Sequence, residues 1–112
     1  MLGFEERYRG NQNIGFVDFR APKVSNKEAR AYVQEKRVFK GSNTAGTHRH
    51  GHYVVYSYGY HWPLFICLYG SQEWIENGDR YSVSTSKHRS QLHPLVNTRV
   101  IPRLEIRERY GI

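Results

Sequence analysis

Residues 52–85 read HYVVYSYGYHWPLFICLYGSQEWIENGDRYSVST, and this stretch decides the fold. Residues 53–58 are rich in strand formers, and residues 64–69 form a nearly continuous apolar run, as in a central strand that is buried on both faces. Residues 73–76 and 80–85 are two shorter strand candidates. The Asn-Gly-Asp sequence at 77–79 indicates a chain reversal between them, because Asn-Gly tolerates positive φ. The stretch predicts an antiparallel meander of four short strands.

On the N-terminal side of this meander, the sequence predicts one main helix. Ser25 and Glu28 fit the capping box that opens a helix, and apolar residues recur at helical spacing after it. We expect a helix over about residues 26–37, whose last turn carries Lys36 and Arg37, followed by an exposed loop over 41–47. Residues 13–20 are a candidate first strand, and residues 1–12 are expected to form a loosely ordered arm.

On the C-terminal side, residues 86–94 show no clear period and residues 95–101 suggest a short last strand. Residues 102–110 suggest either a terminal helix with Pro102 in its first position or an extended edge. The whole chain predicts a single α+β domain over 1–112: a small antiparallel sheet of four to six strands with the helix packed on one face.

The composition points to negatively charged partners. The 112 residues include 17 Lys and Arg against 10 Asp and Glu, a formal net charge of +7, with 14% aromatic residues. Arginine outnumbers lysine, and a guanidinium both grips phosphate with two donors and stacks on bases. Cations for phosphates and rings for bases are the ingredients of nucleic-acid surfaces. An acidic protein would be attracted by the same charges.

Several classes of protein are disfavoured. The longest apolar run is far shorter than a membrane span, and the start of the chain does not resemble a signal peptide. We therefore expect a protein of the cytoplasm, without a membrane. The single cysteine, Cys67, excludes an internal disulfide framework and lies in the apolar run. It is expected to be a buried thiol with a raised pKa.

Three histidines at alternate positions, His48, His50 and His52, are the metal-binding candidate. If this segment is extended, the three imidazoles share one face and can ligate Zn²⁺, Ni²⁺ or Cu²⁺. The alternative is an exposed loop end that bears histidines. No further ligand at a suitable spacing accompanies them, so we favour this alternative and expect neither a metal nor another cofactor.

Two further segments carry candidate binding residues. Rings at 56–62 suggest a stacking platform for bases, with Tyr58 and Tyr60 on a polar loop edge. Hydroxyl, imidazole and basic side chains crowd residues 77–94, where Ser-Lys or Ser-His pairs would suit catalysis. A local orienting acid and the usual nucleophile motifs are missing, so binding fits this segment better than catalysis.

The segment 56–64 (YSYGYHWPL), Trp74, Asn77, the segment 81–91 (YSVSTSKHRSQ) and Pro94 together resemble a small domain of phage, prophage and plasmid proteins. The family pattern has Tyr-Ser, Trp-Pro, a spacer with Trp and Asn, and then Tyr-Ser-x-Thr-Thr-Ser-x-His-x-x-Gln-x-x-Pro. This chain has Ser84 at the first of the two threonines, which keeps the hydroxyl. The resemblance covers 56–94 and implies a mobile-element protein of the bacterial cytoplasm that acts on DNA, RNA or a host defence complex.

If the motif forms one site, His61, Tyr81, Ser86, His88 and Gln91 would line a polar rim. The alternative is a folding motif in which these groups hold loops together internally. The leading hypothesis is a non-enzymatic binding protein that contacts nucleic acid or a nucleoprotein. Its candidate contact residues are Tyr58, Tyr60, His61, Arg80, Tyr81, Ser86, Lys87, His88, Arg89 and Gln91. The alternatives are an inhibitor or adaptor that binds an acidic host protein, and a small metal-assisted or hydrolytic enzyme.

Overall fold

The computed structural model describes residues 21–58, 62–80 and 83–112. These residues form one six-stranded sheet in the order β1 to β6 and three helices. The strands are β1 (Phe39–Lys40), β2 (Thr44–Arg49), β3 (His52–Ser57), β4 (Pro63–Leu68), β5 (Trp74–Asn77) and β6 (Thr98–Ile101), and the helices are α2 (Asn26–Gln34), α3 (Val83–Leu92) and α4 (Arg103–Tyr110). The α+β class is confirmed. The sheet is mixed rather than antiparallel, because β6 runs parallel to β5.

Helix α2 begins where the capping box predicted. The Ser25 hydroxyl accepts a hydrogen bond from the Glu28 backbone N–H, and the Glu28 carboxylate accepts one from the Ser25 N–H. The helix ends at Gln34 rather than Arg37, because Lys36 adopts a left-handed conformation with φ 55°. The backbone N–H groups of Lys36 and Arg37 then bond back to carbonyls of the last turn, an arrangement that usually has glycine in place of Lys36.

The segment predicted as an exposed loop over 41–47 is largely strand β2, whose first four residues are buried. Strand β2 pairs with both β1 and β3 and so lies inside the sheet. Its small residues make room for rings: a Cβ added at Gly46 would lie 2.4 Å from both the Phe39 ring and the Tyr53 hydroxyl. The small residues of this strand are required by close packing. In the sequence alone, the same composition resembles that of a loop.

The predicted strand over 80–85 is wrong. Strand β5 ends at Asn77, and helix α3 begins at Val83 and carries the chain across the sheet to β6. The reversal predicted at 77–79 does not use positive φ, since neither Asn77 nor Gly78 adopts it. Instead, Asn77 is buried at the end of β5.

The C-terminal segment is the predicted strand, shortened to β6, followed by a helix rather than an extended edge. Pro102 is the residue before the first turn of α4, one position earlier than predicted. Gly111 ends the helix with φ 70°, where a residue without a side chain avoids strain. Both ends of α4 are therefore marked in the sequence by the residues that helix termini favour.

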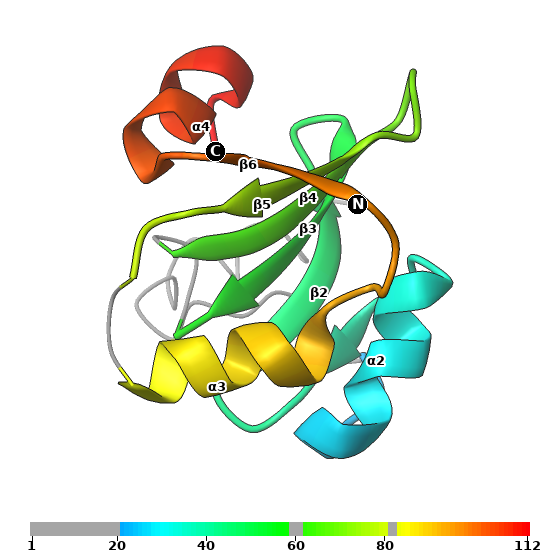
Figure 1. Cartoon of the computed structure of the whole chain (residues 1–112). Coiled ribbons are helices and arrows are strands. Elements are labelled where there is room, and N and C mark those ends of the chain that lie inside the picture. The colour runs from blue at the N-terminus through cyan, green and yellow to red at the C-terminus, as the bar shows by residue number, and fades with distance from the viewer. Residues whose placement is uncertain (1–20, 59–61, 81–82) are drawn as a thin grey trace, which may run out of the picture.

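The two faces of the sheet are covered by different elements (Figure 1). On one face, α2 and α3 pack over a cluster that includes Val33, Phe39, Tyr53 and Leu92. On the other face, α4 packs over a second cluster, which is aliphatic except for Tyr56. Alternation along β3 separates the two clusters: Tyr53 and Val55 belong to the first, Val54 and Tyr56 to the second. The members of the second cluster are Val54, Tyr56, Ile66, Ile75, Ile101, Ile106 and Ile112.

Cys67 lies in the first cluster, fully buried, and burial raises the pKa of its thiol, as the sequence predicted. Within the described ranges, none of the helices is long and apolar enough to cross a membrane. The predicted arm at 1–12 and the strand predicted at 13–20 fall in residues that the structure does not describe.

Candidate functional site

Helix α3 carries half of the predicted contact residues. The side of this helix that faces the sheet is formed by Thr85, His88 and Leu92, which are all buried and follow one another at helical spacing. Lys87 and Ser90 are exposed on the other side, and Ser86, Arg89 and Gln91 are half-buried. The candidate residues on α3 therefore fall into two groups, those that face the sheet and those that face outward.

His88 is in the group that faces the sheet. Its Nδ1 lies 2.8 Å from the Ser57 hydroxyl, and both side chains are buried. Burial lowers the pKa of His88, and the Lys87 charge adds to this effect, so the imidazole is neutral at pH 7. The Tyr58 ring lies 5.4 Å from the imidazole. Because the Ser57 hydroxyl is fully buried, the geometry suits a structural hydrogen bond better than an attack on a substrate.

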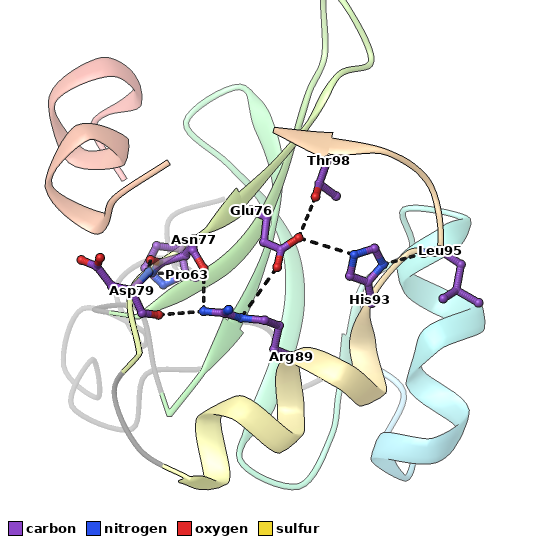
Figure 2. A network of polar contacts seen from close by, with 8 residues as sticks. All are labelled: Pro63, Glu76, Asn77, Asp79, Arg89, His93, Leu95 and Thr98. Atoms are coloured by element: carbon purple, nitrogen blue, oxygen red, sulfur yellow. Dashed lines mark hydrogen bonds and ion pairs between the residues drawn. The ribbon is translucent and has the colours of Figure 1, made fainter. Parts of the chain in front are cut away.

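Arg89 is bound by the scaffold (Figure 2). One of its terminal nitrogens donates to the backbone carbonyls of Asn77 and Asp79, each at 2.7 Å. Its Nε lies 3.9 Å from the Glu76 carboxylate. A guanidinium with these acceptors fixes α3 against the end of β5. Arg89 therefore has a role in the fold that competes with its predicted role as a contact residue for nucleic acid or a nucleoprotein.

Glu76 joins three elements in the same network (Figure 2). Besides Arg89 on α3, its carboxylate accepts a hydrogen bond of 2.6 Å from the Thr98 hydroxyl on β6. It also lies 3.4 Å from Nε2 of His93, whose Nδ1 accepts a hydrogen bond from the Leu95 N–H. Sequence reasoning missed Glu76, and it counted His93 only among the polar side chains that crowd residues 77–94. The available signal was a carboxylate that directly follows the apolar pair Trp74 and Ile75 in a short strand, because a carboxylate removed from water needs a partner.

Asn77 supports this network from within the sheet. Its side-chain amide donates to the Pro63 carbonyl at 2.8 Å, and its side-chain oxygen accepts from the Asp79 N–H. Asn77 and Pro63 both belong to the pattern that resembles the mobile-element domain. For Asn77, Pro63 and His88, the contacts agree with the folding-motif alternative.

The outward side of α3 borders a basic groove. An open groove of about 320 Å³ between α2 and α3 is lined by Lys27, Arg30, Ser90 and Gln91. The Arg30 guanidinium donates to the Ser90 carbonyl at 2.5 Å, which ties α2 to α3. Helix α3 contains no carboxylate. Sequence reasoning missed Lys27 and Arg30, because α2 was interpreted only as a packing element.

The remaining predicted contact residues are dispersed. Arg80 is exposed in the segment before α3, and Tyr58 is 36% exposed after β3. Lys27, Arg80 and Lys87 have no ion-pair partner within residues 21–58, 62–80 and 83–112. Tyr60, His61 and Tyr81 lie outside the described residues, so the predicted polar rim is only partly placed.

The three histidines do not share one face. His50 and Gly51 form a tight turn between β2 and β3, with φ of 54° and 79°. His48 pairs with Tyr53 across this hairpin, whereas His52 pairs with Arg49, so the two imidazoles start from opposite faces. In the described part of the chain, no group of three His, Cys, Asp or Glu side chains is placed to hold a metal ion. The extended arrangement considered from the sequence is therefore wrong.

Comparisons with protein-family models, with curated proteins and with solved structures find no match to this chain. The fold and the site define an α+β domain in which a helix without carboxylates is held on a mixed sheet by buried polar contacts. The geometry of α2 and α3 is therefore the feature of the molecule that indicates a function.

Proposed function

We propose that this protein binds nucleic acid, alone or in a nucleoprotein complex, through the outward side of α2 and α3. The observation that carries the proposal is the basic groove between these helices, with Lys27 and Arg30 on one wall and Ser90 and Gln91 on the other. Lys87 lies exposed on the same helix as Ser90. Ammonium and guanidinium groups contact phosphates, and hydroxyl and amide side chains add hydrogen bonds to the backbone or to bases.

The charge distribution supports this choice of ligand. The chain has a formal net charge of +7, which raises the local concentration of polyanions and speeds their association. Several other arginines are paired with carboxylates in the structure, as Arg99 is with Glu73 and Arg109 is with Glu105. Lys27 and Lys87, by contrast, form no ion pair with a carboxylate within the described residues. A phosphate backbone would supply the missing negative charge.

The resemblance of residues 56–94 to a domain of phage, prophage and plasmid proteins supports a broader context for this activity. We propose a mobile-element protein that acts in the cytoplasm of a bacterial host. An acidic host protein is the second class of partner that the same charges would attract. The buried state of Ser57 and His88 gives no comparable support to a hydrolytic enzyme.

The test is a fluorescence-anisotropy titration with short single- and double-stranded DNA and RNA at about 50 and 200 mM salt. We expect binding that weakens steeply with salt. The double variant Lys27→Ala/Lys87→Ala should reduce the slope of log K against log salt by about 2 on duplex DNA, because two phosphate contacts are lost. Arg107→Ala is the matched control, since it removes an exposed cation from α4 on the other face of the sheet.

Two outcomes would contradict the proposal. Binding that does not change with salt would show that phosphates are not contacted. An equal loss of affinity in Arg107→Ala and in the single variant Lys87→Ala would show that binding depends on the total charge and not on the face formed by α2 and α3. If polyglutamate binds as tightly as DNA and RNA at the same salt, the acidic-protein alternative replaces the nucleic-acid proposal.

A further inference from the structure

The polar side chains of α3 differ in whether the protein itself provides their partners. His88 and Arg89, which reach the sheet, are bonded to the Ser57 hydroxyl and to two backbone carbonyls. The outward side chains that form no hydrogen bond or ion pair with any residue in the ranges 21–58, 62–80 and 83–112 are those of Lys87, Ser90 and Gln91. Their donors and acceptors are therefore available to a ligand.

These three side chains form one stripe along α3, with α2 beside it. Positions 90 and 91 follow position 87 by three and four residues, so all three share one face of the helix. The Arg30 guanidinium on α2 donates to the Ser90 carbonyl, and the Gln34 amide donates to the Pro94 carbonyl. Both contacts advance by four residues, so α2 and α3 run in the same general direction there. Lys27 therefore lies toward the same end of the helix pair as the beginning of the stripe.

Neither α2 nor α3, as far as the structure describes them, presents an exposed aromatic ring. The sequence of α3 has no Phe, Tyr or Trp, and Tyr32 on α2 is half-buried against the first cluster with the Arg37 guanidinium over its ring. Tyr58 lies on the sheet side of α3, where its ring is 5.4 Å from the buried His88. Proteins that bind single strands depend on rings on which unpaired bases stack. A surface without such rings suits bases that are already stacked in a duplex.

The shape of this surface distinguishes between duplexes. The stripe lies on a helix of 10 residues, about 15 Å long, and borders the open groove of about 320 Å³ that Lys27 and Arg30 also line. The major groove of B-form DNA is about 12 Å wide and admits an α-helix, whereas that of A-form RNA is too narrow for side chains to reach the bases. With α3 in the major groove, a bordering phosphate strand would meet the cations of α2. The arrangement therefore favours duplex DNA.

We propose that α3 enters the major groove of duplex DNA and contacts base edges through Ser90 and Gln91, while Lys27 and Arg30 hold the adjoining phosphates. This role rests on the nucleic-acid binding proposed above and adds the form of nucleic acid and the means of recognition. A glutamine amide donates to N7 of adenine and accepts from its N6, a pairing that distinguishes adenine from the other bases. Gln91 therefore specifies an adenine, and the Ser90 hydroxyl adds a contact that several bases can satisfy.

The first measurement compares forms of nucleic acid. Short duplexes that the full chain enriches from a randomised DNA pool are sequenced, and one of them is titrated by fluorescence anisotropy. Its separated strands and the RNA duplex of the same sequence are titrated at the same salt concentration. We expect the enriched sequences to share an adenine, and the DNA duplex to bind at least about tenfold more tightly than the other forms.

The second measurement tests the contact to adenine. Gln91→Ala should weaken binding to the enriched duplex at least about fivefold and remove the preference for adenine. Replacing that adenine by 7-deazaadenine removes N7 and keeps the base pair, so it should weaken binding of the parent chain and leave that of Gln91→Ala unchanged. Lys87→Ala is the matched control on the same stripe, since loss of a phosphate contact should weaken all duplexes alike and keep the preference.

Several results would overturn this role of α3 while leaving the nucleic-acid binding proposed above in place. They are salt-sensitive binding that is equal for duplex DNA, duplex RNA and single strands, a selection without a shared base, and a parent chain that is insensitive to 7-deazaadenine. The last measurement needs no variant, so it decides the question even if Gln91→Ala does not fold. If no nucleic acid binds in a salt-dependent way, the proposed function itself is wrong, and this role of α3 is wrong with it.

Discussion

Helices α3 and α4 cover opposite faces of one sheet and are held there by different chemistry. Helix α3 has Leu92 in the core and is otherwise anchored by polar contacts, from His88 to Ser57 and from Arg89 to the end of β5. Helix α4 is anchored by Ile106 and by Ile112 just after it, which lie in an aliphatic cluster. Hydrogen bonds and ion pairs are directional, so they are lost when a donor, an acceptor or a charge is removed. Apolar contacts are not directional and weaken with the apolar surface and volume that a substitution removes. The placement of α3 should therefore be sensitive to changes that leave α4 unaffected.

The largest effect is expected from Arg89→Ala. This change leaves the carbonyls of Asn77 and Asp79 without their donor and removes an ion-pair partner of Glu76. We expect the free energy of unfolding to fall by about 3 kcal/mol, as for other broken, partly buried ion pairs. Urea denaturation followed by circular dichroism measures this loss.

The control for Arg89 is Arg109→Ala on α4. Arg109 forms an exposed ion pair with Glu105 one helical turn away, and such pairs contribute about 0.3–0.5 kcal/mol. Equal losses in the two variants would contradict the distinction between polar anchorage of α3 and apolar anchorage of α4.

The next effect is a dependence of stability on pH that originates at His88. Its pKa in the folded protein lies below the value of about 6.5 expected in the unfolded chain. Well above pH 6.5 the imidazole is neutral in both states, and the free energy of unfolding does not depend on its protonation. As the pH falls below 6.5, the unfolded chain takes up a proton first, so the free energy of unfolding decreases by up to about 1.4 kcal/mol per pH unit until the folded pKa is reached.

His88→Gln tests this dependence, because glutamine retains a hydrogen-bonding side chain but does not titrate. Urea denaturation of both proteins at several values between pH 7 and pH 5 should show a steeper loss in the parent chain. Parallel curves would mean that the burial of His88 does not couple its protonation to folding.

Among the buried anchors of the two helices, the smallest effect is expected from Ile106→Val on α4. Ile106 is almost completely buried in the aliphatic cluster, and removing one methylene from such a site costs about 1 kcal/mol. This variant should keep the pH dependence of the parent chain, since no titratable group is lost. A change in its pH dependence would show that the two faces of the sheet are coupled.

The parts of the fold that could be predicted are those with local signals. The capping box at Ser25 and Glu28 locates the start of α2, and the apolar and branched residues of β3 and β4 identify two central strands. Strand β2 could not be predicted, because its small residues are selected by the rings of Phe39 and Tyr53. Helix α3 could not be predicted either, because its Ser and Thr residues have low helix propensity. The side chains that anchor it contact residues that are distant in the sequence.

The candidate site was predictable in composition and less so in geometry. The segment that became α3 was identified as important, but its division into buried His88 and exposed Lys87 depends on helical spacing, and residues 86–94 show no clear period in the sequence. Lys27 and Arg30 lie about 60 residues from their groove partners Ser90 and Gln91. Only the packing of α2 beside α3 brings these side chains together, so no local pattern indicates the groove.

The parallel pairing of β5 and β6 has a kinetic consequence. Strands β4 and β5 are joined by residues 69–73, whereas β5 and β6 are joined by residues 78–97, a connection about four times as long. Chain entropy makes closure of the longer connection about 1 kcal/mol more costly. This entropy is lost before any hydrogen bond between β5 and β6 forms. During folding, the consecutive hairpins have the entropic advantage, and the β6 edge is disfavoured as the nucleus of the sheet.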